Sequence, residues 1–301
     1  MGEVLWDALP EGLYLGGAPF NVACHLHALG EEVAMVSRVG EDRLGREALR
    51  RLKARGMTTA LVQVDADLET GFVKVALDDS GGAEYVIVQP AAWDALTLTG
   101  ALSERASEAA ALVFGTTLAQ RRERTRRTVR ALCDMRDDTL KVLDVNLRPP
   151  YGQRSVIEAS LDLADVAKLN EQELFKISGW LDLSGDLRGT VAALARRFGC
   201  RAVCVTRGAE GSALWRDGEW TRRGSYSVSV QDTVGAGDAF LAALLAGLLD
   251  GQASDVVLAR ANRLGAYVAS RAGGTPAYDI GRWSDIPQLA LDTPEPAEAA
   301  R

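Results

Sequence analysis

The sequence is poor in cysteine, in long apolar runs and in excess basic charge, and each of these absences excludes a class of protein. Four scattered cysteines in 301 residues do not make a disulfide framework, so we expect reduced thiols and a cytoplasmic protein. The longest nearly uninterrupted apolar run, AFLAALLAGLL, has 11 residues and is too short to cross a membrane. The formal net charge of −7 argues against a nucleic-acid partner. The opening MGEVLWDALP has no basic leader, so we expect no signal peptide.

Metal-binding and nucleotide-binding motifs of the common kinds are also absent. Cys24, His25 and His27 would point in different directions from a helix, so packing or surface roles are favoured over metal binding. Cys200 and Cys204 flank a β-like run and are expected to be buried small side chains. No G-x-x-x-x-G-K-[ST] loop exists, which excludes a P-loop enzyme. A dinucleotide fingerprint fails because Phe240 stands where a third glycine is needed, which disfavours an NAD-dependent oxidoreductase.

What the sequence does contain is an alternation of strands and helices from residue 100 onward. The predicted strands are ALVFG, KVLDVN, DVAKLN and AVCVT, followed by a β-like patch over 213–230. The predicted helices cover 101–110, 121–136, 155–163, 171–178, 188–198, 236–249 and 254–270. This order predicts an α/β protein with a mostly parallel central sheet covered by helices on both faces. Such sheets bind ligands beyond the carboxyl ends of their strands.

Residues 60–90 have a different character, because ALVQVD, TGFVKVALDD and AEYVIV are short, β-rich and separated by turn signals such as DDSGG. We interpret them as a small β-sheet lid over the ligand crevice. The predicted organisation is a single domain over residues 1–290, with the lid formed by about 12–18 and 60–95. Residues 291–301 are predicted to be a loose tail.

The stretch QDTVGAGDAF places three small residues and an aspartate where a long helix begins. Backbone N–H groups of Gly235, Ala236, Gly237 and Asp238 would face a common point, and small residues would let a phosphate approach them. Asp238 could then accept a proton from a hydroxyl beside that phosphate, which is what phosphoryl transfer to an alcohol requires. The alternative is a tight strand-to-helix turn with an aspartate that complements the helix dipole. These residues alone do not decide between the two.

A second stretch, LYLGGAPFNVACHLHALG, places Gly16 and Gly17 before a helix expected to open with Asn21. Together, GGAPFN and DTVGAGD resemble the two signatures of the ribokinase, or PfkB, family of carbohydrate kinases. The resemblance covers nearly the whole chain, from GEVLWD to SRAGGTPAY, with five motifs in the expected order. GEVLWDALPEG, GGAPFN, AAWDAL and DVNLRPP are most similar to bacterial fructokinases. The resemblance implies a ribokinase-like three-layer α/β/α fold with a small β-sheet lid.

The same resemblance implies a sugar site and a catalytic site. Its sugar-binding residues are Asp7, Asn21 and Asn146, with Gly16 and Gly17 at the hinge between lid and core. The Asp7 carboxylate can accept two hydroxyl hydrogen bonds, as a polyol demands. The catalytic residues are Asp238 as base, Gly235, Ala236 and Gly237 as anion hole, and Arg148 bridging the transferring phosphoryl group.

The resemblance also implies ATP and metal ions as cofactors. The residues implied in binding ATP are Lys168, Asn170, Thr206, Gly208, Gly211 and Asn262. Mg²⁺ is implied at Asn170 and Glu173 of KLNEQE, held through water. A monovalent cation such as K⁺, which many members bind, is implied at Asp232, Val234 and Gly273.

The implied activity is ATP-dependent phosphorylation of a sugar, with fructose favoured as the acceptor. Ribose, 2-keto-3-deoxygluconate or a nucleoside is the first alternative, and a catalytically silent relative is the second. We also expect a homodimer formed through the lid, because a small sheet with one apolar face can scarcely bury it alone. Two features depart from the family pattern: Phe20 stands where a small residue is commoner, and the first strand is unusually short at its N-terminal end. A start site upstream of Met1 would explain the short strand.

Overall fold

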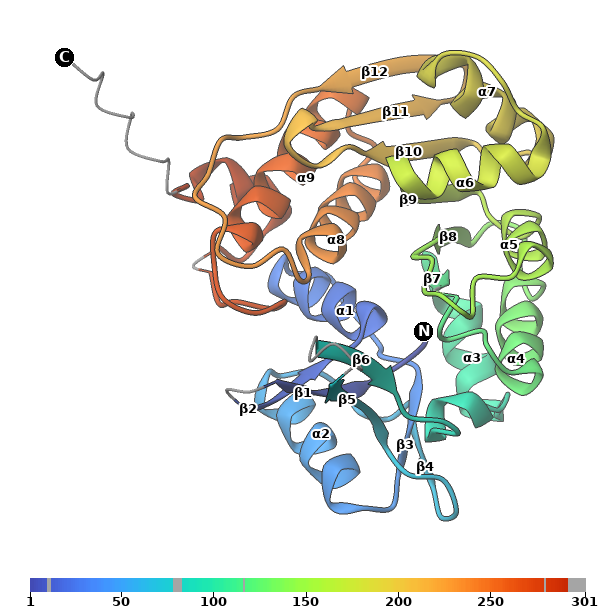
Figure 1. Cartoon of the computed structure of the whole chain (residues 1–301), viewed down its shortest axis with the longest axis vertical. Helices are drawn as coiled ribbons and strands as arrows, with labels where there is room; N and C mark the ends of the chain where they lie inside the picture. Colours follow the sequence, from blue (N-terminus) through green and yellow to red (C-terminus); the bar gives the residue numbers. More distant parts are fainter. Residues whose placement is uncertain (10–11, 78–82, 116, 279, 292–301) are drawn as a thin grey trace.

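The computed structural model describes residues 1–9, 12–77, 83–115, 117–278 and 280–291. The predicted tail falls almost wholly outside these residues, as does the predicted DDSGG turn. The strands of the described residues form three sheets, of six, four and two strands, and Figure 1 shows the six-stranded one as a curved sheet that extends from β7 to β12.

The larger sheet has six strands in the order β12-β11-β10-β9-β8-β7. Its strands are β7 (Ala111–Gly115), β8 (Leu140–Asp144), β9 (Val166–Asn170), β10 (Ala202–Thr206), β11 (Ser212–Arg216) and β12 (Glu219–Arg223). The first four are mutually parallel, and β11 and β12 continue the sheet in antiparallel pairing. The predicted patch over 213–230 therefore supplies an antiparallel hairpin, and the prediction of a mostly parallel sheet is confirmed.

Helices cover both faces of this sheet, because neighbouring residues of each strand point to opposite faces. In β8, Val142 packs with one buried cluster and Leu143 with the other. The helices on the side of Val142 are α1 (Ala18–Ala28), α8 (Ala236–Leu249) and α9 (Ser254–Ala269). Those on the side of Leu143 are α4 (Glu123–Cys133), α5 (Arg154–Leu161), α6 (Glu171–Leu181) and α7 (Leu187–Phe198). The predicted three-layer α/β/α arrangement is confirmed.

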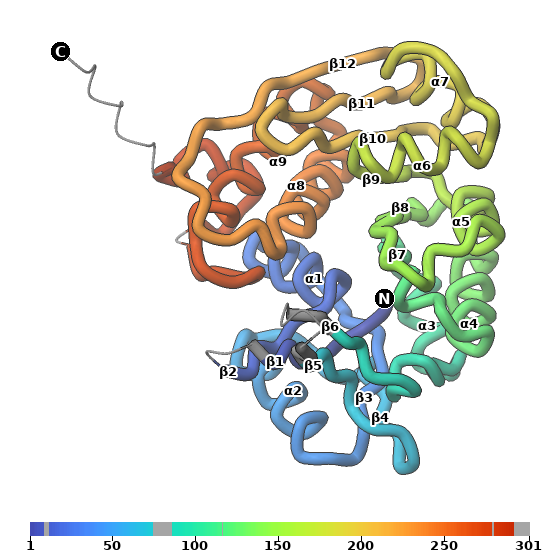
Figure 2. Tube along the Cα trace, viewed as in Figure 1, coloured from blue at the N-terminus to red at the C-terminus, as the bar shows by residue number. Residues whose placement is uncertain are grey.

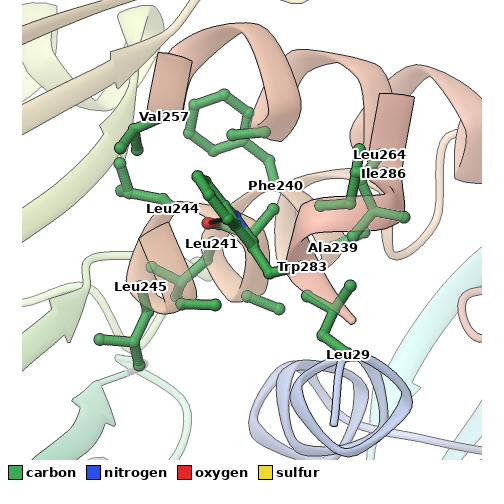
Figure 3. Close-up of a cluster of buried hydrophobic side chains, with 14 of the residues drawn as sticks. Leu29, Ala239, Phe240, Leu241, Leu244, Leu245, Val257, Leu264, Trp283 and Ile286 are labelled. Carbon is green, nitrogen blue, oxygen red and sulfur yellow. Dashed lines mark hydrogen bonds between the residues drawn. The ribbon is translucent and has the colours of Figure 1, made fainter. Parts of the chain in front are cut away.

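Helix α8 is apolar on all sides because it lies buried between α1, α9 and the sheet. Figure 3 shows Trp283, from the short helix η3 (Trp283–Gln288), within this cluster beside Leu241 and Leu244. The Trp283 indole donates a 2.6 Å hydrogen bond to the Ala243 carbonyl of α8. The apolar run of the sequence is therefore a core helix, and no helix of the described residues is long and apolar enough to cross a membrane.

The smaller sheet has four strands in the order β2-β1-β5-β6. They are β1 (Leu5–Leu9), β2 (Gly12–Gly16), β5 (Gly71–Leu77) and β6 (Ala83–Ile87). Figure 2 shows β1 and β2 beside β5 and β6, although more than fifty residues separate the pairs in sequence. The predicted first strand thus joins the small sheet.

The expectation that all of residues 60–95 form one small sheet is wrong for its first strand. Strand β4 (Val62–Asp65) pairs in parallel with β3 (Ser37–Gly40) as a separate two-stranded sheet. The connecting helix α2 (Arg43–Ala54) brings β4 back beside β3 and buries Leu52 against Val39. Residues 92–95 form a short 3-10 helix, η1, and α3 (Gly100–Glu108) follows it.

The starts of α2 and α1 are fixed in different ways. Asp42 caps α2, since its Oδ1 accepts a 2.7 Å hydrogen bond from the Gly45 N–H. Helix α1 begins at Ala18, three residues before Asn21, with Gly17 as its cap and Pro19 in its first turn. The prediction that Asn21 opens this helix is therefore wrong, and Asn21 lies one turn inside it.

Candidate active site

The structure brings the two glycine-rich signatures into direct contact. Asn21 of α1 donates a 2.8 Å hydrogen bond from Nδ2 to the Oδ2 atom of Asp238, in the first turn of α8. Both side chains are buried, although 217 positions separate them in sequence. Asn21 was predicted to bind sugar, and it also holds the carboxylate predicted to act as base.

Asp238 has an environment that suits proton transfer near neutral pH. Burial, helped by the neighbouring negative charge of Asp144, raises the pKa of Asp238 to about 6. The charges of Lys168 and Arg148 and the hydrogen bond from Asn21 oppose this rise in pKa. A carboxylate with such a pKa is a stronger base than an exposed aspartate and is still mostly ionised at pH 7.

The backbone before Asp238 is shaped as an anion cradle. Gly235 caps α8 with φ of 76°, and a Cβ there would lie 2.3 Å from the Gly274 carbonyl oxygen, so only glycine fits. Ala239 donates to the Gly235 carbonyl at 2.8 Å, so the N–H groups of Gly237 and Asp238 precede the first turn of intrahelical bonds. A Cβ on Gly237 would lie 3.3 Å from Lys168 Nζ, which places a cation beside the cradle.

Lys168 lies in the middle of β9, opposite Asp144 at the end of β8, and forms an ion pair with it, with Nζ 3.1 Å from Oδ1. Burial by itself lowers the pKa of Lys168, but the charges of Asp144, Asp238 and Glu173 outweigh it and raise the pKa, so the ammonium persists. The Oδ2 atom of Asp144 is buried with no hydrogen-bond partner. Sequence reasoning missed Asp144; its place at the carboxyl end of a parallel strand was the available signal.

The predicted sugar-binding Asp7 lies in β1 opposite Tyr14 of β2. A Cβ on Gly16 would lie 2.7 Å from Asp7 Oδ2, so glycine at 16 leaves room for the carboxylate. Burial raises the pKa of Asp7, and the charge of Arg148 opposes that rise. Because Arg148 acts on both Asp7 and Asp238, its guanidinium lies in the field of both carboxylates. Gly17 has φ of 108°, another position that favours glycine.

The loop after β8 is held by two side chains. Thr117 donates from Oγ1 to the Asn146 carbonyl at 3.2 Å and accepts from the Arg148 N–H at 2.8 Å. The Leu147 N–H donates to Glu173 Oε1 at 2.7 Å. Asn146 itself has φ of 36°, in the left-handed region, which these contacts maintain. Sequence reasoning missed Thr117, and no motif in the sequence marks it.

Asn170 and Glu173, predicted to hold Mg²⁺, form the capping box of α6. The Asn170 side chain accepts from the Glu173 N–H, and Glu173 Oε2 accepts from the Asn170 N–H, each at 2.8 Å. Burial raises the pKa of Glu173, although the hydrogen bond from the Asn170 N–H and the charge of Lys168 each lower it. Within the described residues no group of three or more His, Cys, Asp or Glu side chains could hold a metal directly. Oxygen donors held in this way fit a hydrated Mg²⁺, which keeps its water ligands.

Two of the residues predicted to contact ATP, Gly211 and Asn262, meet at Gly224, just after β12. A Cβ on Gly211 would lie 2.7 Å from the Gly224 Cα, and Asn262 of α9 donates a 3.2 Å hydrogen bond to the Gly224 carbonyl. Thr206 ends β10, and Gly208 begins the short helix η2 (Gly208–Glu210) that leads to Gly211. The structure therefore brings three separate motifs to one end of the sheet.

The three residues predicted to bind a monovalent cation also lie together. Asp232 accepts from the Val234 N–H at 2.9 Å through Oδ1 and from the Gly273 N–H at 3.1 Å through Oδ2. Gly274, which follows, packs against Gly235 of the anion cradle. The Asp232 carboxylate thus links the loop before α8 to the loop after α9.

Comparison with known proteins agrees with this arrangement. The family model for the pfkB family carbohydrate kinase matches residues 11–280. A fructokinase of Salmonella typhimurium is 31% identical over 300 residues, which cover 94% of this chain and 96% of that protein. A fructokinase of Escherichia coli is 32% identical over 259 residues, which cover 82% and 83%. A sugar kinase from Pyrococcus horikoshii, solved in complex with ATP, matches with a TM-score of 0.77 at 27% identity and covers 96% of each chain.

The family match spans most of the chain, and the fold and the contact between the two signatures agree with it. The protein is a sugar kinase, a phosphotransferase with an alcohol group as acceptor. The chain belongs to the PfkB family of carbohydrate kinases.

Proposed function

We propose that the protein transfers the γ-phosphate of ATP to a hydroxyl group of fructose. The observation that carries this proposal is the buried Asn21–Asp238 contact at the N-terminus of α8, with Lys168 beside it. It combines a base of raised pKa with an anion cradle, which are the two parts that phosphoryl transfer to an alcohol needs. The fructokinases among its relatives support fructose, and the ATP complex of a relative supports ATP as donor.

In this proposal the acceptor hydroxyl lies between Asp238 and the γ-phosphate. Asp238 takes the hydroxyl proton as the oxygen attacks phosphorus, and the bond from phosphorus to the leaving oxygen of ADP breaks. The N–H groups of Gly237 and Asp238 would stabilise the negative charge on the phosphoryl oxygens together with that of Gly235, and Arg148 and Lys168 would add positive charge. The Ala236 N–H donates to the Thr233 carbonyl at 3.3 Å and would have to give up that bond to join them. An oxyanion-hole donor contributes roughly 3 to 4 kcal/mol to lowering such a barrier.

Metal ions would assist from two places. Asn170 and Glu173 would hold Mg²⁺ through water, close to the unpartnered Asp144 Oδ2, and the ion would neutralise charge on the ATP phosphates. A monovalent cation such as K⁺ would bind where Asp232 joins Val234 and Gly273. Thr206, Gly208, Gly211 and Asn262 would line the nucleotide side of the site.

The remaining parts of the proposal concern the sugar and the assembly. Asp7 and Asn146 would bind sugar hydroxyls, and the sheet β2-β1-β5-β6 would close over them as a lid hinged at Gly16 and Gly17. The protein would act as a homodimer paired through this lid. A cytoplasmic location is supported by its cysteines, which are all free and buried.

The test is a coupled ADP-release assay over fructose, ribose, 2-keto-3-deoxygluconate and several nucleosides, with and without K⁺. We expect fructose to give the highest kcat/KM and K⁺ to raise the rate. A nucleoside or another sugar with a higher kcat/KM would overturn the choice of fructose and leave the kinase assignment standing. A catalytically silent relative would release no ADP with any acceptor.

A further inference from the structure

The face of α1 that carries Asn21 carries a second buried polar side chain. His25 follows Asn21 one turn further along the helix, and 1% of its surface is exposed. A buried imidazole needs partners for both of its ring nitrogens, because an unpaired polar group in the interior is costly. Both partners of His25 lie outside α1, in the loop that follows α9.

One ring nitrogen contacts the backbone beside the anion cradle. His25 Nε2 lies 3.0 Å from the carbonyl oxygen of Gly274. A Cβ placed on Gly235 would lie 2.3 Å from that same oxygen, and one placed on Gly274 would lie 3.1 Å from Asn21 Nδ2. Gly274 is therefore packed between two polar side chains of α1 and the glycine that caps α8.

The other ring nitrogen contacts Tyr278, in the same loop. The Tyr278 hydroxyl lies 3.1 Å from His25 Nδ1, closer than the 3.4 Å that separates it from the His25 carbonyl oxygen. The two rings are nearly parallel, with an angle of 4° between their planes, and Tyr267 of α9 packs edge-on against Tyr278. The Tyr267 hydroxyl also donates a 3.2 Å hydrogen bond to the Ala277 carbonyl, so the loop is held against both helices.

These partners determine which nitrogen of His25 carries the proton. A carbonyl oxygen only accepts, so Nε2 carries the proton and donates it to Gly274, and Nδ1 accepts from Tyr278. Burial lowers the pKa of His25 to about 4, although the hydrogen bond to Gly274 opposes this, so the ring is neutral at pH 7. His25 thus holds the Gly274 carbonyl without adding a charge beside the cradle.

We propose that His25 is a positioning residue for phosphoryl transfer, whose Nε2–H holds the Gly274 carbonyl against Gly235 and so orients the N–H groups of the anion cradle. One face of α1 then orders both parts of the site: Asn21 holds the Asp238 carboxylate, and His25 holds the backbone of the cradle. This role rests on the cradle of the proposed function and is independent of which sugar is the acceptor. Because the cradle acts on charge in the transition state, loss of His25 should lower kcat and leave the sugar KM nearly unchanged.

The test compares His25→Gln with His25→Asn, assayed with the acceptor that gives the highest kcat/KM. The Gln amide nitrogen reaches the position of the imidazole Nε2, whereas the Asn amide ends near the position of Nδ1, so only Gln can donate to Gly274. We expect His25→Gln to keep kcat within about threefold of the parent and His25→Asn to lower it about tenfold or more. The sugar KM should stay within about twofold in both.

Two further variants complete the comparison. His25→Met fills the space of the ring without a donor, so it should lose kcat as His25→Asn does, and it replaces His25→Asn if that variant does not fold. His27→Asn is the matched control, because His27 points from another face of α1 toward Gly56 and should leave kcat and both KM values unchanged. His27 is also the only other histidine of the chain, so this control assigns the imidazole signals in proton–nitrogen NMR. In the parent, these signals should place the His25 proton on Nε2.

Equal kcat values in His25→Gln and the variants without a donor would overturn the proposal, whether all are near the parent or all are low. A sugar KM that rises as much as kcat falls would also overturn it, and so would a proton on Nδ1 of the parent ring. Failure of the cradle itself gives a different result, because Gly237→Val would then leave ATP binding intact. If Gly237→Val weakens ATP binding while kcat ignores the donor at position 25, only the role of His25 is wrong.

Discussion

At the scale of single residues, the site depends on how one buried carboxylate is held. Asp238 receives a hydrogen bond from Asn21 and lies in the fields of Lys168 and Arg148, while Asp144 repels its charge. These opposing effects leave the pKa of Asp238 at about 6. A carboxylate with this pKa can take up and release a proton near physiological pH. Each partner can be changed by itself, so its part in catalysis can be separated.

Asp238→Asn is the most direct test of the base. Asparagine is nearly isosteric, so the cradle and the helix start should remain, and ATP affinity should persist or rise slightly as a negative charge is lost. We expect kcat to fall by about 10² to 10⁴. Gly237→Val should instead crowd the phosphate and weaken ATP binding. If the Asp238→Asn enzyme folds and phosphorylates sugar at nearly the parental rate, the GAGD stretch is only a structural turn and Asp238 is not the base.

Asn21→Ala should change the pH profile of the enzyme. The hydrogen bond from Asn21 lowers the pKa of Asp238, so its loss should raise that pKa further. The base works only when deprotonated, so kcat/KM should fall as pH drops through about 6 in the parent and at a higher pH in the variant. The pH dependence of kcat/KM from pH 5 to 9 measures both. Coincident acidic limbs would show that Asn21 does not control the base.

Asp7→Ala tests the sugar pocket. Asp7 is half-buried beneath Gly16, and its loss should leave sugar hydroxyls unpaired in a closed site. Steady-state kinetics should show a sugar KM raised by well over tenfold, with the KM for ATP much less affected. Asp137→Ala, in the turn between α4 and β8, is the matched control and should leave both constants unchanged. A sugar KM within about twofold of the parent would show that the pocket lies elsewhere.

At the scale of elements, α8 carries both the cradle and the centre of the core. Its N-terminus presents Asp238, and its later turns pack against α1, α9 and Trp283. Gly247 lets the indole approach, since a Cβ there would lie 2.4 Å from a Trp283 ring atom. The packing that fixes the far end of α8 thereby fixes the direction in which its N-terminus points.

Trp283→Ala should destabilise the fold through α8. It removes a buried indole, leaves a cavity beside α8 and loses the hydrogen bond from the indole to the Ala243 carbonyl, at a cost of about 3 to 5 kcal/mol in unfolding free energy. Urea unfolding followed by circular dichroism measures this cost. Trp180→Ala, at a half-buried position on α6, should cost clearly less. Equal costs for the two variants would mean that Trp283 does not anchor α8.

The strands and helices were largely predictable, while their grouping was not. Helix 236–249 matched its predicted bounds because an uninterrupted apolar run follows a glycine cap. Pro19 shifted the start of α1 ahead of Asn21, since proline suits the first helical turn. Strand β4 was assigned to the wrong sheet because a short β-rich sequence does not indicate which strand it pairs with. The crossover through α2 places β4 beside β3. No local pattern marks Thr117, so its contacts needed the tertiary structure, whereas Asp144 could have been proposed from its place at the carboxyl end of a parallel strand.

At the scale of the whole molecule, the small sheet bears on how two copies could meet. Leu13 and Tyr14 of β2 are each 45% exposed, at the outer edge of the four-stranded sheet. Exposed apolar side chains at a sheet edge are typical of surfaces that pair with another chain. This supports the proposed dimer through the lid.

The dimer is tested by light scattering at micromolar concentration. We expect the parent to have the mass of two chains and Leu13→Asp to have the mass of one, because a buried charge opposes the interface. Phe175→Asp removes an even more exposed apolar side chain, on α6, and should leave the mass unchanged. A parent that is a monomer would refute the dimer, and a dimer lost only in Phe175→Asp would place the interface on α6.

The hydrogen bond between Asn21 and Asp238 also bears on synthesis of the chain. Its two residues are 217 positions apart, so during translation Asn21 cannot form this bond until most of the protein has been made. Until α8 has left the ribosome, α1 has no partner for one apolar side and the base does not yet exist. A nascent or truncated chain that stops before α8 is therefore inactive, and activity appears only once the whole fold has formed.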